Sequence, residues 1–297
     1  MPYDTARAER VAMIDYTYQV QGDATLYLGD ALEVVRTLPS ESVNCVVTSP
    51  PYYFMRDYGV EGQYGLENTP QAYVDTLRGL FREIRRVLTA DGTAWLNVGD
   101  AYSQRKAVRM SSHQEGLHGV RAVKPTWVDS RAAGMARMSS ENVIDGTAIP
   151  EKSLMMLPER LVVGMIEDGW ILRNRITWDK SFSIPDPTRD RFKARTEPVF
   201  FFSKSRRYFF DAPTDRGDIW RIAPSSGADT HTASFPPDLA RRCILAGCPE
   251  GGTVLDPFSG SGTTGMVALE QGKKYVGIDL NPEYLDLSLR TRLRTTT

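Results

Sequence analysis

Hydrophobic residues recur every three or four positions over residues 69–88, which predicts an amphipathic helix with one buried face. The pair Asp91-Gly92 is expected to end this helix, since glycine readily adopts the left-handed conformation that follows a last helical turn. The same spacing predicts helices over 31–36, 153–167, 237–246 and 263–271, and one that starts at Pro282.

Short hydrophobic or alternating runs predict strands between these helices. They cover residues 24–30, 43–48, 93–98, 170–178, 197–203, 208–210, 253–256 and 274–279. Strands that alternate with helices indicate an α/β fold, an open, mostly parallel, twisted sheet with helices on both faces and ligands at the carboxyl ends of the strands. The runs between residues 170 and 210 predict an antiparallel hairpin at one edge.

Residues 103–150 interrupt this pattern. Hydrophobic periodicity fades, Ser, Gly, Ala and Met become frequent, and basic residues outnumber acidic ones. Such a stretch is typical of an insertion or a long surface loop. The sequence is therefore expected to consist of one α/β domain, formed by 1–102 and 151–297, with an inserted region at 103–150.

The composition fits an ordinary globular protein. The chain has 297 residues, of which 41% are hydrophobic and 25% charged, with a formal net charge of -1. Any nucleic-acid surface must therefore come from local basic patches. Three cysteines are too few for a disulfide framework and lack zinc-site spacing, and no run is long enough for a membrane helix, so a reduced, cytoplasmic setting without a metal or a membrane is expected.

A glycine-rich turn, DPFSGSGTTG from Asp256 to Gly265, lies between a predicted strand and helix. Glycines there let the backbone pass close to a ligand, although a tight turn without a ligand has the same spacing. Asp279 ends the next strand, where a carboxylate can accept ribose hydroxyls or instead cap the following helix. The absence of Gly-Lys-Ser/Thr after Gly262 disfavours a phosphate-binding loop.

The tetrapeptide Ser49-Pro50-Pro51-Tyr52 directly follows the strand at 43–48. It should emerge at the carboxyl edge of the sheet, beside the glycine turn, where an active-site loop is natural. A strand terminator with a packed tyrosine is the structural alternative.

Together, TSPPYY and DPFSGSGTTG resemble the motifs of DNA methyltransferases that modify exocyclic amino groups, in the permuted order with the catalytic motif first. Looser likenesses extend over most of the chain: LYLGDAL, ITWDKS, RDRFKARTEPVFFFSKSRRYFFD and HTASFPPDL. The resemblance implies a Rossmann-like methyltransferase fold, S-adenosylmethionine as the methyl donor, and double-stranded DNA as the substrate in a restriction-modification setting.

The resemblance also implies roles for individual residues. The Ser49 hydroxyl oxygen and the Pro50 carbonyl would accept the two N–H bonds of the target amine, held by the rigid Pro50-Pro51 pair, while Tyr52 would stack on the extruded base. No metal or covalent intermediate is needed. The cofactor would be bound by residues spread along the chain: Asp30, Thr48, Thr232, Phe235, Asp256, Phe258, Gly260, Gly262, Thr263 and Asp279.

Four positions have structural interpretations beside or in place of functional ones. Asp30 could cap the helix that starts at Ala31 instead of facing the cofactor. Asn97 ends a strand, where a closing turn is favoured over a border of the base pocket. Glu197 and Arg191 are assigned structural roles, and a buried ion pair is considered for Glu197.

The target base is predicted from the first residue of the catalytic motif. In the resembled family, serine there mostly accompanies cytosine N4 methylation and aspartate or asparagine adenine N6 methylation, so Ser49 favours cytosine N4 and leaves adenine N6 as the alternative. The chain has no Pro-Cys for ring-carbon methylation. Methylation of protein or RNA is disfavoured by the motif order, and a non-enzymatic DNA-binding protein by the intact motifs.

The inserted region is the candidate for sequence recognition, because little chain is available where this permuted class usually recognises its target. Its basic residues are the proposed DNA contacts: Arg105, Lys106, Arg109, Arg121 and Lys124. A cognate restriction endonuclease and a homodimer are partners that the resemblance suggests by analogy alone.

Overall fold

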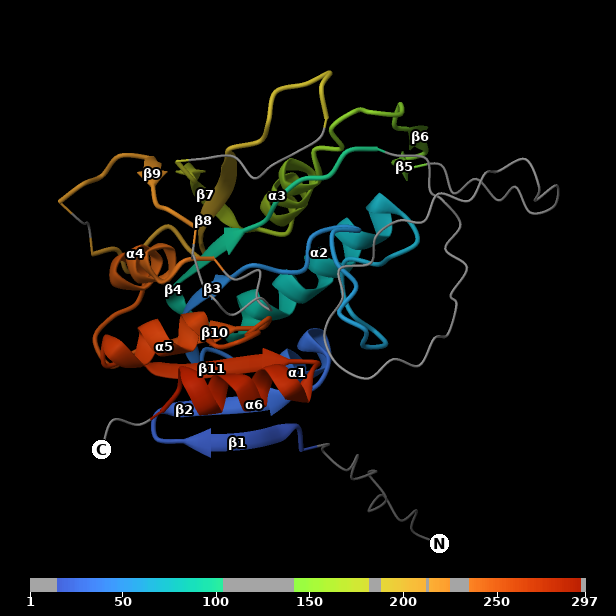
Figure 1. Ribbon diagram of the computed structural model, residues 1–297. Helices are drawn as coiled ribbons and strands as arrows, with labels where there is room; N and C mark the ends of the chain where they lie inside the picture. The colour runs from blue at the N-terminus through green and yellow to red at the C-terminus, as the bar shows by residue number, and fades with distance from the viewer. Residues whose placement is uncertain (1–14, 104–141, 182–187, 212–213, 225–234, 295–297) are drawn as a thin grey trace, which may run out of the picture.

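A computed structural model describes residues 15–103, 142–181, 188–211, 214–224 and 235–294 of the chain. Its main sheet has nine strands in the order β1-β2-β11-β10-β3-β4-β8-β7-β9 (Figure 1). Their bounds in chain order are β1 Thr17–Gln21, β2 Ala24–Leu28, β3 Val43–Thr48, β4 Leu88–Asn97, β7 Ile171–Asp179, β8 Thr196–Ser203, β9 Ile219–Arg221, β10 Thr253–Asp256 and β11 Lys274–Asp279. A separate hairpin joins β5 Val143–Ile144 to β6 Thr147–Ala148.

The centre of the sheet is parallel. The five strands β2, β11, β10, β3 and β4 run in one direction, so their carboxyl ends share one edge. Strand β8 pairs antiparallel with both β4 and β7, and β1 pairs antiparallel with β2. The predicted open, mostly parallel sheet with an antiparallel hairpin toward one side is confirmed.

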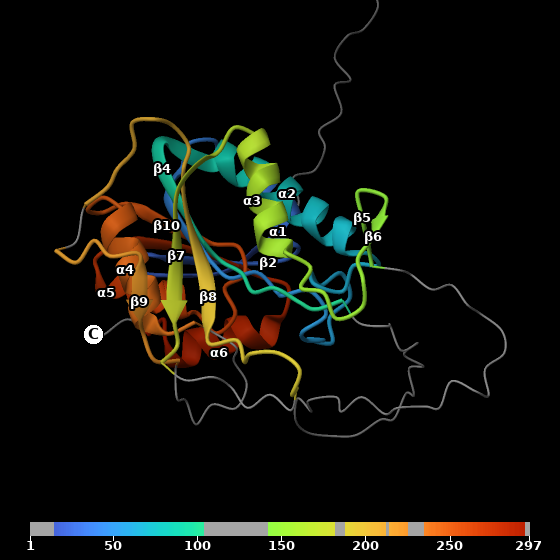
Figure 2. The same cartoon turned by 90° about the horizontal axis from the view of Figure 1, so that it is seen from above.

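Helices cover both faces, as predicted (Figure 2). One face carries α1 Ala31–Thr37, α2 Pro70–Val87 and α3 Leu157–Glu167, and the other carries α4 Pro237–Gly247, α5 Thr263–Glu270 and α6 Pro282–Thr291. Successive strand residues point to opposite faces, so alternate residues of each central strand enter different cores. Phe200 and Phe202 of β8 join the first core, while Val199 and Phe201 join the second.

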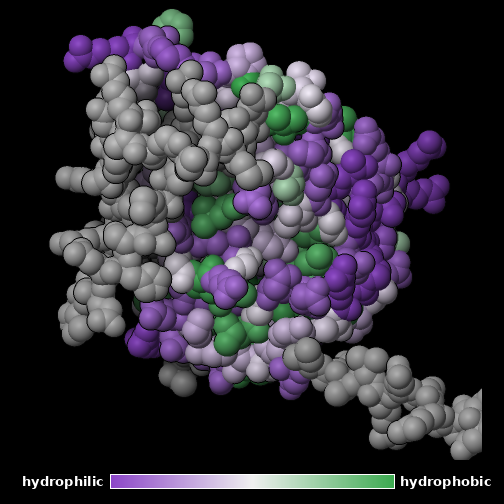
Figure 3. Space-filling view, turned by 90° about the vertical axis from the view of Figure 1, so that its right-hand side faces the viewer, coloured by the Kyte–Doolittle hydropathy of each residue, from purple (hydrophilic) through white to green (hydrophobic). Residues whose placement is uncertain are grey.

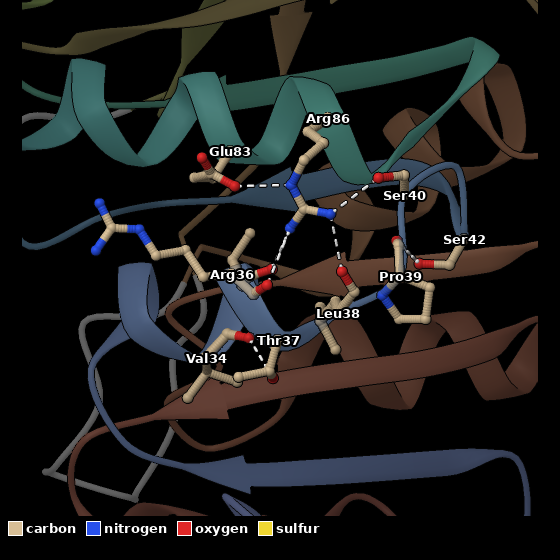
Figure 4. A network of polar contacts seen from close by, with 10 residues as sticks. Val34, Arg36, Thr37, Leu38, Pro39, Ser40, Ser42, Glu83 and Arg86 are labelled. Carbon is tan, nitrogen blue, oxygen red and sulfur yellow. Dashed lines mark hydrogen bonds and ion pairs between the residues drawn. The ribbon is translucent and has the colours of Figure 1, made fainter. Parts of the chain in front are cut away.

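The last turn of α2 is fixed to the loop that precedes β3 by one guanidinium (Figure 4). Arg86 donates to the backbone oxygens of Val35 and Leu38 at 2.9 Å each and pairs with Glu83 at 2.8 Å. These carbonyls belong to the end of α1, where backbone oxygens lack most of their helical donors, although Val35 also accepts the N–H of Leu38 at 3.2 Å. Arg86 therefore holds α1, α2 and the entry to β3 together.

Two predicted helix boundaries are wrong. Helix α2 ends at Val87, before Asp91-Gly92, because Leu88 already pairs with Val43 of β3. Helix α3 begins at Leu157 and not at 153, because Leu154 forms a bridge with Tyr102. The carboxylate of Asp100 then accepts the N–H groups of Met156 (2.8 Å) and Leu157 (3.0 Å) at the start of the helix.

The predicted strand at 208–210 is also wrong. Tyr208 and Phe210 pack on Phe201, with ring centroids 5.7 and 5.6 Å away, so their hydrophobic pattern is satisfied without strand pairing. The next neighbour of β7 is β9, which runs parallel to it and was not predicted. Strand β1 was not predicted either. No helix in the described part of the chain is long and hydrophobic enough to cross a membrane.

Candidate active site

A pocket opens where the central parallel strands end. Figure 3 views the molecule from this side, where hydrophobic residues gather near the centre among mostly hydrophilic ones. The pocket lies at the ends of β2, β11, β10 and β3, and its walls combine polar and aromatic residues: Asp30, Ser49, Pro51, Tyr58, Tyr64, Phe235, Asp256, Phe258, Gly260, Thr263, Asp279 and Tyr284. The two motifs of the sequence thus face one pocket.

The glycine turn forms one wall. Gly260 (φ 52°) and Gly262 (φ 81°) both have the left-handed backbone conformation that favours glycine. A Cβ on Gly262 would lie 2.8 Å from Cβ of Ser288 in α6, whereas one on Gly260 would enter open space. The turn is therefore packed tightly behind and leaves its backbone accessible in front, as a close ligand requires.

Asp279 lies across from this turn at the end of β11. Its carboxylate accepts the N–H of Gly260 at 2.7 Å and that of Asn281 at 2.9 Å. The N-cap of α6 is Asn281, whose side chain accepts from Glu283, so the capping alternative for Asp279 does not describe the structure. Desolvation by burial raises the pKa of Asp279 to about 6, although backbone hydrogen bonds oppose the shift.

Asp256 connects the two motifs and is only 3% exposed. Its carboxylate accepts the hydroxyls of Thr48 and Thr264, each at 2.7 Å, and the N–H of Phe258 at 3.1 Å. Burial raises the pKa of Asp256 to about 6 despite these hydrogen bonds. Asp256 therefore joins the end of β3 to the end of β10 and the first turn of α5.

Two other predicted cofactor residues also have structural partners. Asp30 lines the pocket and caps α1, where it accepts the N–H of Glu33 at 3.0 Å, so both of its interpretations are compatible with the structure. Thr263 lines the pocket, and its hydroxyl accepts a hydrogen bond from Arg292. The guanidinium of Arg292 also donates to Ser261 at 2.6 Å, which fixes the turn from its far side.

Ser49 begins the opposite wall, and its partners come from distant strands. The Ser49 hydroxyl donates to Oδ1 of Asn97 at 3.4 Å, and the Tyr52 hydroxyl donates to Glu197 at 2.8 Å and lies 3.2 Å from the same Asn97 oxygen. The Pro51 carbonyl accepts from the Tyr73 hydroxyl at 2.9 Å. The motif is therefore held at three of its four residues.

Asn97 and Glu197 hold Ser49 and Tyr52 in position. Asn97 ends β4, is 2% exposed, and donates through Nδ2 to the Pro198 carbonyl at 3.1 Å and to Glu197 at 3.3 Å. Glu197 forms an ion pair with Lys180, just beyond the end of β7. We call Ser49, Tyr52, Asn97, Glu197 and Lys180 the Ser49 side of the site, and Asp256, Gly260 and Asp279 the glycine-turn side.

Residues 43–290 match the family model of the DNA methylases. The chain belongs to this DNA methylase family. Curated relatives of the methylase include the type II methyltransferases M.XycI of Xanthomonas campestris pv. cyanopsidis and M.Cfr9I of Citrobacter freundii. The first is 42% identical, covering 89% of this chain and 86% of the relative, and the second is 39% identical, covering 90% and 86%.

Solved structures share the fold of the methylase. The cytosine-N4-specific PvuII DNA methyltransferase is 22% identical and matches 92% of this chain and 88% of its own with a TM-score of 0.66. A Thermus thermophilus protein solved with S-adenosyl-L-methionine is 25% identical, covers 89% of this chain and 91% of its own, and has a TM-score of 0.59. Family membership confirms the resemblance and, with it, S-adenosylmethionine as the methyl donor.

The described residues fit this donor at the pocket. A carboxylate suited to ribose hydroxyls, an accessible glycine backbone and aromatic rings surround one space, and Phe258 lies against Tyr64 with ring centroids 5.2 Å apart. Among the predicted cofactor residues, Thr48 and Gly262 lie behind the wall, and Thr232 lies outside the described residues. The pocket is also lined by three tyrosines that were not predicted: Tyr58, Tyr64 and Tyr284.

The sequence only partly revealed the Ser49 side. Asn97 was favoured as a turn residue, and Lys180 was not singled out, although both stand at strand ends on the active edge. The ion pair considered for Glu197 is present. The five basic residues proposed as DNA contacts lie outside the described part of the chain.

Proposed function

We propose that the chain transfers a methyl group from S-adenosylmethionine to N4 of a cytosine extruded from double-stranded DNA. The observation that carries the proposal is the position of Ser49. Ser49 and Pro51 line the same pocket as Gly260 and Asp279, so an amine bound by the catalytic motif would face a cofactor bound at the glycine turn. Serine at this position favours cytosine N4 over adenine N6.

The cofactor side of the proposal follows from the chemistry of its walls. Bound S-adenosylmethionine supplies an electrophilic methyl group on a sulfonium. Asp279 would accept the ribose hydroxyls, Phe258 would pack on the adenine, and Gly260 would let the backbone approach. Asp30, Asp256, Thr263 and Phe235 would complete the site, together with Thr232.

Ser49 would orient the target amine. The Ser49 hydroxyl donates a hydrogen bond to Oδ1 of Asn97, which leaves its oxygen lone pairs to accept one N–H of the amine. The Pro50 carbonyl would accept the other N–H. Both hydrogen bonds turn the nitrogen lone pair toward the methyl group, and fixed acceptors avoid the cost of reorganising them during transfer. The amine nitrogen would gain the methyl carbon as the carbon–sulfur bond of the sulfonium breaks, leaving a neutral thioether, and the nitrogen would then release one proton to solvent.

Tyr52 would hold the plane of the base. Its hydroxyl is fixed by Glu197, and its ring passes so close to Gly99 that a Cβ there would lie 2.4 Å from the ring. A ring with so little freedom gives an extruded base one defined surface for stacking. Gly99 is therefore expected to be needed for the position of Tyr52.

Sequence recognition is proposed to belong to the inserted region at 103–150, on the strength of its basic residues. Arg105, Lys106, Arg109, Arg121 and Lys124 remain its candidate phosphate or base contacts. A partner endonuclease and a homodimer remain predictions by analogy.

The test is nucleoside mass spectrometry and single-molecule sequencing of DNA from cells that express the chain in a host without its own methylation. We expect N4-methylcytosine at one short sequence. Recovery of N6-methyladenine alone would overturn the choice of base, and the absence of any methylated base in DNA would overturn the function.

Removing the Ser49 hydroxyl should test its role. Ser49→Ala should lower the transfer rate at saturating substrates by roughly 100-fold, because one positioned acceptor in an enclosed site contributes about 3 kcal/mol. Ser42→Ala is the matched control, since the exposed Ser42 hydroxyl donates only to the Pro39 carbonyl at 2.7 Å. Equal rates for the two variants would contradict the assignment of Ser49.

A further inference from the structure

The loop between β7 and β8 starts and ends at the Ser49 side of the site. Its described residues, 188–195, rise above β7 and β8 in Figure 1. Lys180 precedes the loop and Glu197 follows it, and these two form the ion pair beside Tyr52. Arg195 closes the base of the loop with two hydrogen bonds to Asp179, at 2.7 and 2.9 Å.

Two more contacts tie this loop to the body of the protein. Asp190 pairs with Lys152 at 2.7 Å, and the guanidinium of Arg191 stacks 3.9 Å from the centre of the Tyr102 ring. Tyr102 in turn forms a bridge with Leu154 just before α3. Asp190 and Arg191, the two residues before Phe192, therefore both contact the body of the protein.

Phe192 projects from this tethered loop into solvent. Its side chain is 98% exposed, compared with 60% for Ile219, the next most exposed large hydrophobic residue in the described part of the chain. Exposing a whole aromatic ring to water is unfavourable, and a ring in this position is available to stack on a partner. Its immediate neighbours Arg191 and Lys193 are both basic.

The charge around Phe192 matches a nucleic acid. Residues 189–195, RDRFKAR, contain four basic residues and one acidic residue, in a chain whose formal net charge is -1. Arg189 and Lys193 are exposed. An aromatic ring between basic side chains suits DNA, where bases offer stacking surfaces and phosphates offer negative charge.

We infer that Phe192 inserts into or stacks on the DNA duplex beside the extruded nucleotide, with Arg189 and Lys193 against the neighbouring phosphates. The inference rests on the proposed function and adds a DNA contact to it. Extrusion leaves base faces without their stacking partner, and an apolar wedge at that point lowers its cost. Phe192 lies five positions before Glu197, so their Cα atoms are at most about 17 Å apart at roughly 3.4 Å per residue. This limit is comparable with the width of the major groove, about 12 Å, so Phe192 can contact DNA close to a nucleotide bound at the Ser49 side.

The experiment compares Phe192→Ala and Phe192→Trp on two unmethylated duplexes that carry the sequence the protein recognises. One duplex is fully paired and the other is mismatched at the target base. A mismatch lowers the cost of extrusion. Phe192→Ala should reduce kcat/KM about 10-fold or more on the paired duplex and much less on the mismatched one, and Phe192→Trp should restore most of the rate. With a fluorescent cytosine analogue that pairs with guanine at the target position, Phe192→Ala should also reduce the fluorescence increase that accompanies extrusion.

Two control variants separate stacking from charge. The double variant Arg189→Ala, Lys193→Ala should lower the affinity for both duplexes to the same extent. It should also reduce the salt dependence of binding, because phosphate contacts do not depend on base pairing. Val163→Ala, at a 56% exposed position on α3, should change neither rate.

The outcomes distinguish this inference from the proposed function. If the unaltered protein methylates DNA and Phe192→Ala reduces kcat/KM equally on both duplexes, the inference that Phe192 inserts into the DNA is wrong and the proposed function stands. If Phe192→Ala instead changes the oligomeric state in sedimentation without a duplex-dependent rate, the residue contacts a second copy of the chain and the wedge is also wrong. An unaltered protein that leaves DNA unmethylated overturns the function itself.

Discussion

The glycine-turn side of the pocket takes its polar groups from one stretch of chain, residues 256–281, whereas the Ser49 side takes them from the ends of four strands far apart in the sequence. The first side relies on backbone groups and on carboxylates whose pKa is raised by burial. The second relies on side chains that fix one another. A rigid backbone pocket suits a cofactor of constant shape, and a side-chain network suits the alignment of one reacting amine.

The contrast predicts that binding and transfer can be damaged separately. Substitutions on the glycine-turn side should weaken the affinity for S-adenosylmethionine, and substitutions on the Ser49 side should slow methyl transfer while the cofactor still binds. The geometry supports this division because the two sides meet mainly through the buried Thr48 and Asp256, 2.7 Å apart.

Asp279→Ala should have the largest effect. It removes the acceptor proposed for both ribose hydroxyls and the partner of the Gly260 N–H. Two hydrogen bonds to a charged group contribute roughly 3 kcal/mol in total, so the Kd for S-adenosylmethionine should rise about 100-fold. Calorimetry with the cofactor alone measures this change.

Asp238→Ala is the matched control for that measurement, since Asp238 lies on α4 with a 77% exposed side chain. Its Kd should equal that of the unaltered protein. An Asp279→Ala variant that is folded by circular dichroism and binds the cofactor normally would contradict the role of the glycine-turn side.

Glu197→Gln should have a smaller effect, on transfer and not on cofactor affinity. The variant leaves Lys180 without its ionic partner and weakens the hydrogen bonds that hold Tyr52 and Asn97. The single-turnover rate should fall about 10-fold, equivalent to about 1.4 kcal/mol of positioning, with the Kd for S-adenosylmethionine unchanged.

Glu250→Gln, at an exposed position before β10, is the control and should leave the rate intact. If Glu197→Gln instead raised the Kd for the cofactor and spared the rate, the two sides of the pocket would not be separable. Rescue by Glu197→Asp is not expected, because a shorter side chain cannot reach both Lys180 and Tyr52.

The same contrast explains how far the sequence could be interpreted. Strands β3, β10 and β11 and the start of α6 were predicted to the residue, because their hydrophobic runs are bounded by the motifs themselves. The glycine-turn side followed from one contiguous segment. Asn97 and Glu197 are 100 residues apart and meet only through the pairing of β4 with β8, which no local pattern encodes.

Strands β1 and β9 were not predicted from the sequence, for a related reason. Both lie at the edges of the sheet, where exposed positions blur the alternation, and β9 has only three residues with one buried. For Phe192, the sequence revealed the residue type but not its exposure. Its hydrophobic character was visible in RDRFKAR, but its 98% exposure depends on contacts of Asp190 and Arg191 with residues elsewhere in the chain.

Lowering the pH should have the smallest effect and should be confined to the glycine-turn side. The pKa of Asp279 is raised to about 6, and the proposed ribose contact needs the ionised carboxylate. For one group with that pKa, the ionised fraction falls from about 0.9 at pH 7 to about 0.25 at pH 5.5, so the Kd for S-adenosylmethionine should rise roughly fourfold.

Folding stability should respond in the opposite sense. A carboxyl whose pKa is higher in the folded chain than in the unfolded one favours folding when protonated, so the free energy of unfolding should fall as the pH rises from about 4 to about 6.

Asp279→Asn should remove most of the fourfold change in the Kd for S-adenosylmethionine, and Glu197→Gln should preserve it. A Kd that stays constant between pH 5.5 and 7 in the unaltered protein would remove the ionised carboxylate from cofactor binding, and with it the main chemical difference between the two sides of the pocket.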